Sequence, residues 1–155
     1  MTRIPSTSIP QTLADALRQT ANRLARGERY AWTHMGACNC GHLAQTVTLS
    51  SPQELHEIAL MRAGDWSEQL REYCPTSGYP LDIIIERLVE LGATRAELAH
   101  LERLSDPAVL RLIPVDRRRE LSFRERDDVI LYMRTWAELL DQKAITSPAL
   151  VSIHC

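Results

Sequence analysis

Two thiols and two imidazoles crowd into eleven residues of this 155-residue chain, in the segment WTHMGACNCGH over residues 32–42. Cys38 and Cys40 are two residues apart, His42 follows two residues later, and His34 precedes Cys38 by four. Thiolate and imidazole are the side chains that bind soft and borderline metal ions, and thiolate is also a strong nucleophile. The crowding therefore predicts a site for metal or thiol chemistry in this segment.

A metal site is the first interpretation of the segment. Side chains two residues apart on a helix point about 200° away from each other. Cys38, Cys40 and His42 can therefore converge on one ion only where the backbone is extended or looped. Gly36 and Gly41 lie within the segment and give its backbone the conformational freedom for such a loop.

Two side chains outside this core would complete a metal site. His34 would join from the preceding turn, and Cys74 would come from a separate loop, CPTSGYP over residues 74–80. Three thiolates with one or two imidazoles suit a tetrahedral zinc ion, and mixed Cys/His ligation also suits an iron–sulfur cluster. We expect zinc or an iron–sulfur cluster as the cofactor. The predicted metal ligands are His34, Cys38, Cys40, His42 and Cys74.

Two other functions stay open, and with them the question of whether the chain is an enzyme. In the first, the chain is a thiol-dependent enzyme or redox protein: a helix starting near Gly41 would favour the thiolate of Cys40, with a histidine as base. Cys38 and Cys40 would then be able to form a disulfide. In the second, the chain is a helical protein-interaction module without metal, in which these side chains only pack, since free cysteine is among the most buried residue types.

The rest of the chain carries sequence signals for a series of helices. Capping boxes of the form Ser/Thr/Asp-x-x-Glu, which predict helix starts, occupy residues 51–54, 65–68, 94–97 and 122–125. Apolar residues at helical spacing follow them, and only residues 43–49 offer a strand, which alone cannot form a sheet. We therefore predict an all-α fold: one small domain over residues 1–155, with about six or seven helices and one irregular Cys/His-rich loop. The ends, 1–9 and 147–155, are expected to be loosely ordered.

Composition narrows the class of protein. Apolar residues make up 45% and charged residues 25%, which is ordinary for a soluble globular domain. A net charge of −2 gives no electrostatic reason to expect nucleic acid as a partner. No apolar run is long enough to span a membrane, and the first residues lack the apolar segment of a secretory signal. We expect a cytoplasmic protein that binds an unknown small molecule or protein, and homo-oligomerisation stays open.

Overall fold

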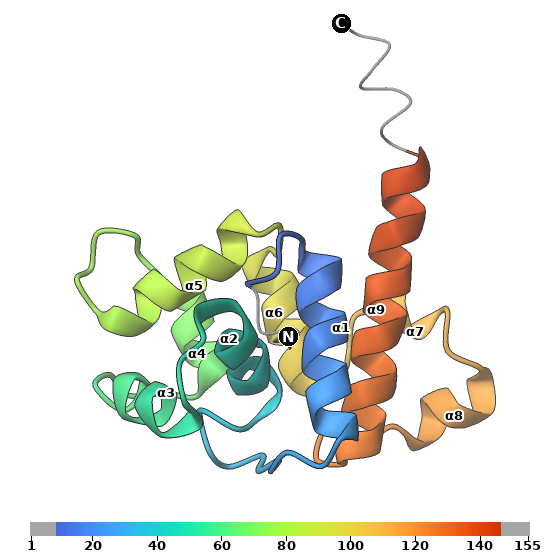
Figure 1. The fold of residues 1–155 in the computed structure, drawn as a ribbon, viewed down its shortest axis with the longest axis horizontal. Coiled ribbons are helices and arrows are strands. Elements are labelled where there is room, and N and C mark those ends of the chain that lie inside the picture. The colour runs from blue at the N-terminus through green and yellow to red at the C-terminus, as the bar shows by residue number, and fades with distance from the viewer. Residues whose placement is uncertain (1–8, 147–155) are drawn as a thin grey trace, which may run out of the picture.

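The computed structural model describes residues 9–146, and in this range the chain forms helices and no strand (Figure 1). The helices are α1 (Leu13–Ala25), α2 (Asn39–Thr48), α3 (Pro52–Ala59), α4 (Trp66–Arg71), α5 (Pro80–Glu90), α6 (Arg95–Arg103), α7 (Pro107–Leu110), α8 (Val115–Glu120) and α9 (Arg126–Thr146). The predicted all-α fold is confirmed, with nine helices in the described range where six or seven were expected. Apart from Ile9, the ends predicted to be loosely ordered lie outside the described residues.

The one strand candidate of the sequence, residues 43–49, is helical up to Thr48 as part of α2, and Leu49 is the C-cap of that helix. Cys40, Leu43 and Val47 recur at helical spacing, and all three are buried in the core. The irregular Cys/His-rich loop is not confirmed as predicted. Irregular backbone runs over residues 26–38, whereas Cys40 and His42 lie on α2.

Three of the predicted capping boxes are confirmed with both of their hydrogen bonds, at the starts of α3, α4 and α6. The fourth is not formed as predicted. The Ser122 hydroxyl accepts a hydrogen bond from the Arg124 amide at 3.2 Å, and α9 begins only at Arg126. Asp128 accepts the Ser122 amide instead, at 2.9 Å, so the side chain that fixes this turn comes from within α9.

Helix α2 is the centre of the fold. It packs against α1, α3, α5 and α6, while α1 and α9 lie side by side along one flank (Figure 1). The core is filled mainly by aliphatic side chains, with Trp66, Tyr132 and Trp136 as its largest buried members. The Cys40 and His42 side chains on α2 are therefore enclosed by the surrounding helices. None of the helices in the described range is long and apolar enough to cross a membrane.

The segment of residues 30–38 leads into α2 through a series of tight turns. The Ala31 amide donates to the Ala37 carbonyl at 3.0 Å, and the Ala37 amide donates to the His34 carbonyl at 2.9 Å. Gly36 allows this segment to lie directly on α3, because a Cβ at this position would stand 1.9 Å from the Pro52 carbonyl oxygen. The close approach of two backbones thus fixes how the 30–38 segment enters α2.

Replacement of Gly36 by alanine tests this approach. We expect Gly36→Ala to lower the free energy of unfolding by about 3 kcal/mol or more, because the added methyl group meets backbone that cannot rotate away. Gly27→Ala is the control: its Cβ would meet nothing within 4 Å, and its φ of +105° leaves only left-handed strain, about 1 kcal/mol. Urea unfolding of both variants measures the difference. Equal costs would contradict the described contact.

Candidate functional site

The first turn of α2 carries Cys38 and Cys40, two of the three thiols of the predicted site. Cys38 is the N-cap residue and Cys40 is the second residue of the helix, and the Cys38 side chain makes no capping hydrogen bond. The acceptor comes from α6, because a Glu102 carboxylate oxygen (Oε1) accepts the Cys40 amide at 2.8 Å. In return the Asn39 side chain donates to the carbonyls of Leu101 and Glu102, at 3.0 and 3.1 Å. The start of α2 and the end of α6 therefore form hydrogen bonds with each other's free backbone groups.

The structure brings Cys38 and Cys40 together with Glu102, a residue that the sequence analysis did not find. Both cysteines are at most 1% exposed, and the Glu102 carboxyl lies near enough to both thiols to raise their pKa values. The Cys40 thiol also donates to the Leu98 carbonyl at 3.2 Å. The one available signal for Glu102 was its place beside Leu98 and Leu101 on the buried face of a helix, because an unpaired glutamate is rarely buried.

Cys38, Cys40 and Glu102 are all acidic groups, and within residues 9–146 no basic side chain forms an ion pair with Glu102. Burial raises the pKa of both thiols well above the ordinary value, and the nearby Glu102 raises it further. Burial likewise raises the pKa of Glu102. The other buried carboxylates of the described residues, Asp82 and Asp128, each pair with an arginine, at 2.7 and 2.8 Å. Among the described residues Glu102 is the buried carboxyl that lacks such a partner.

His42 is buried on a different side of α2. Its Nε2 lies 2.7 Å from the Arg29 carbonyl oxygen, so the neutral imidazole donates there. Its Nδ1 faces the donors Arg23 Nη1 and Gln45 Nε2, each at 3.4 Å. Burial lowers the pKa of His42 to about 4, and the Arg23 charge also lowers it. The imidazole thus belongs to a polar network between α1 and α2, and it is separate from the cluster of Cys38, Cys40 and Glu102.

His34 and Cys74 lie in two further places. The His34 ring stacks on His56 with centroids 4.1 Å apart, and the Nδ1 atoms of the two rings accept the amides of Gly36 and Met35, each at 3.1 Å. Cys74 is exposed on the loop between α4 and α5, with its thiol 3.4 Å from the Thr76 hydroxyl. No three His, Cys, Asp or Glu side chains of the described chain are arranged to hold a metal ion.

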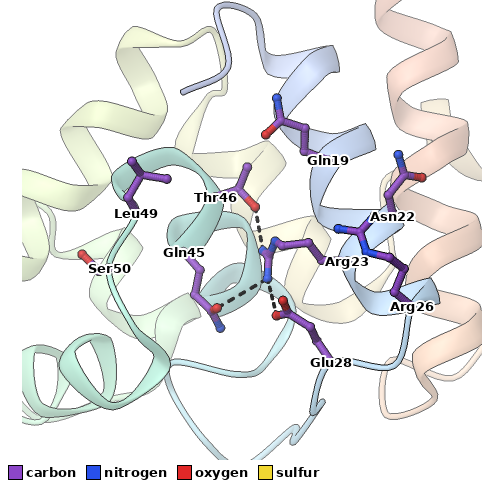
Figure 2. A pocket seen from close by; sticks show the side chains of 9 residues that line it. All are labelled: Gln19, Asn22, Arg23, Arg26, Glu28, Gln45, Thr46, Leu49 and Ser50. Carbon is purple, nitrogen blue, oxygen red and sulfur yellow. Dashed lines mark hydrogen bonds and ion pairs between the residues drawn. The ribbon is translucent and has the colours of Figure 1, made fainter. Parts of the chain in front are cut away.

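A separate hollow of about 350 Å³ lies between α1 and the C-terminal half of α2 (Figure 2). Arg23 reaches into it from α1 and is held at 2.6 Å by both the Glu28 carboxylate and the Thr46 hydroxyl. The lining residues are Gln19, Asn22, Arg23, Arg26, Glu28, Gln45, Thr46, Leu49 and Ser50. This hollow shares the Arg23–His42 network, and it is a second candidate site.

No protein-family model, curated protein or solved structure matches this chain. The two sites are therefore interpreted from their own geometry.

The three described cysteines should differ strongly in reactivity. Hydrogen bonds from Thr76 lower the pKa of the exposed Cys74 thiol, whereas Cys38 and Cys40 are enclosed and have raised pKa values. We expect iodoacetamide at neutral pH to modify Cys74 at least about 100-fold faster than the other two, measured by peptide mass spectrometry. In urea the three should react alike. Native-state alkylation of Cys40 at the rate of Cys74 would contradict the described burial.

His42 should make the folded state sensitive to acid. Its pKa in the folded protein, about 4, lies below the unfolded value of about 6.5, so the unfolded chain binds the proton more readily. The resulting stabilisation is complete above about pH 6.5 and is lost as the pH falls toward about 4. As the pH falls from about 7.5 to about 4.5, the free energy of unfolding of the wild type should decrease. In His42→Asn this decrease should be about 2 kcal/mol smaller, as measured by urea unfolding.

The control for this measurement is His100→Asn, which changes a half-buried histidine that bonds Ser105 on another part of the fold. It should keep the acid sensitivity of the wild type. An unchanged pH dependence in His42→Asn would show that the imidazole is not held neutral by the fold.

Proposed function

We propose that the chain binds a thiophilic metal ion, zinc in the first place, through Cys38 and Cys40 with Glu102 as a third ligand. One observation carries this proposal: the buried Glu102 carboxyl, which has no basic partner within residues 9–146, accepts the Cys40 amide and lies near both buried thiols. Thiolate sulfur and carboxylate oxygen are ordinary zinc ligands.

The charge balance of the group favours a cation. Isolated buried carboxylates cost several kcal/mol, and elsewhere in this fold an arginine offsets that cost for Asp82 and Asp128. At Glu102 a divalent ion would offset this cost, as the arginines do for Asp82 and Asp128. Binding of the ion would displace the protons of the two thiols, and the free energy of binding would then add to the stability of the folded state.

The proposed ligand set departs from the one predicted by spacing. It keeps Cys38 and Cys40 and replaces the three remaining predicted ligands with Glu102. The side chains have to rotate to close around an ion, because the described residues hold no preformed group of three ligands. Of the three described thiols two gather here, which favours a single ion over an iron–sulfur cluster held by four cysteines. An ion at this enclosed place would tie α2 to α6 and serve the structure.

A second candidate function is thiol redox chemistry at the same cysteines. It is favoured by the position of Cys38 and Cys40, two residues apart at the N-terminus of α2, and it has to overcome the raised pKa of both buried thiols. Two thiols would give two electrons and two protons to a small-molecule disulfide, which becomes two thiols, while a Cys38–Cys40 disulfide forms. Glu102 would accept the proton of the first thiol to ionise.

Metal analysis of the protein purified without oxygen and without added chelator tests the proposal. We expect about one zinc ion per chain by mass spectrometry, because the three ligands would fill most of a four-coordinate site. Cys38→Ser and Cys40→Ser should abolish the uptake, and Glu102→Gln should reduce it. Cys74→Ser is the matched control, since it removes an exposed thiol and should leave the zinc content unchanged.

Two results would overturn the metal proposal. A folded, metal-free chain with both thiols reduced would favour the interaction module, in which the cysteines only pack. A disulfide in the peptide that carries Cys38 and Cys40, again without metal, would favour the redox function. Alkylation of the denatured protein before digestion separates these two results.

A further inference from the structure

We propose that the hollow between α1 and α2 binds a small oxyanion, the phosphate or carboxylate group of a polar metabolite, with Arg26 as the charged recognition group. The proposal is independent of the thiol group, which lies at the other end of α2.

The hollow is built from a polar stripe on α1. Gln19, Asn22 and Arg26 lie three and four residues apart, so they share one face of the helix with Arg23. This face meets the end of α2, where an amphipathic helix would ordinarily present apolar side chains to its neighbour. Of the nine lining residues only Leu49 is apolar. A polar wall of this kind suits a ligand that forms hydrogen bonds.

Arg23 forms a fixed floor and is not the receptor itself. Its Nη1 pairs with Glu28 at 2.6 Å, and its Nη2 donates to the His42 carbonyl at 2.8 Å and to Thr46 at 2.6 Å. Figure 2 shows the guanidinium enclosed between the side chains of Thr46, Gln45 and Glu28. Because Glu28 balances its charge, Arg23 shapes the hollow without adding net charge to it.

The remaining donors are unused. Within residues 9–146 the structure gives no partner to the guanidinium of Arg26 or to the side-chain amide of Gln19. Asn22 accepts a hydrogen bond from Arg134 through its oxygen, at 3.0 Å, which leaves its amide hydrogens available. With Arg23 and Glu28 paired, Arg26 gives the lining a net charge of +1. Unused donors around one uncompensated guanidinium match an anion rich in acceptor oxygens.

The size of the hollow limits the ligand. A volume of about 350 Å³ lies at the lower end of the range for small-molecule sites. It suits a single small metabolite and is too small for a folded partner or a long peptide. The proposed ligand is therefore a compact molecule with one phosphate or carboxylate group directed at Arg26.

Thermal unfolding and isothermal titration with sodium phosphate and with sodium citrate, at constant ionic strength in chloride, test the proposal. We expect a saturable rise in Tm with at least one of the two anions, because a ligand that binds only the folded state stabilises it. Arg26→Ala should weaken that binding about tenfold, the usual effect of removing a charge-assisted contact. Saturation by phosphate alone or by citrate alone identifies which oxyanion the hollow prefers.

Arg29→Ala is the matched control. Arg29 is exposed, lies three residues after Arg26 and does not line the hollow. Arg29 contacts His42 through its backbone carbonyl, which the substitution retains. This variant should bind the anion like the wild type. The proposal fails if neither anion gives a saturable effect, or if Arg26→Ala and Arg29→Ala weaken binding equally, since the effect would then reflect overall charge.

Discussion

The start of α2 has to find hydrogen-bond acceptors inside the protein, and the rest of the structure depends on how it does so. The first amides of any helix lack partners within the helix, and those of α2 cannot reach water because four other helices surround it. Its N-cap residue, Cys38, contributes no side-chain acceptor. Glu102 supplies the acceptor from α6, and Asn39 returns hydrogen bonds to the last carbonyls of α6. This reciprocal arrangement puts a carboxyl among the thiols.

Helix α2 thereby separates two polar environments of opposite character. Around Cys40 the buried ionisable groups of the described chain are acids, and none of them pairs with a basic side chain. Around His42 they are an arginine, amides and hydroxyls, with Glu28 balancing the arginine. Two residues along a helix turn the side chain through about 200°, which is why neighbours in the sequence serve different surroundings. A segment that looks like one cluster of ligands is therefore divided in space by its own secondary structure.

The sequence predicted what depends on neighbouring residues and missed what depends on distant ones. The three capping boxes that the structure confirms join side chains three residues apart, so the local pattern was enough. The capping of α2 joins residues 62 positions apart, and no local pattern announces it. The alternation of Val47 and Leu49 resembled a strand, but Leu49 is the exposed, left-handed residue that ends α2. The closeness of Cys38 and Cys40 followed from spacing, whereas the stacking of His34 on His56 required α3 to dock.

The distance along the chain between Cys40 and Glu102 also sets an order of events in time. A ribosome releases the segment that carries both thiols well before it releases α6, so the thiols stay open to solvent until the later helix docks. Once α6 is in place, both sulfurs are at most 1% exposed. An ion or oxidant would therefore reach the sulfurs most easily before α6 docks. An ion bound at the proposed site would then stay enclosed for as long as α6 remains docked.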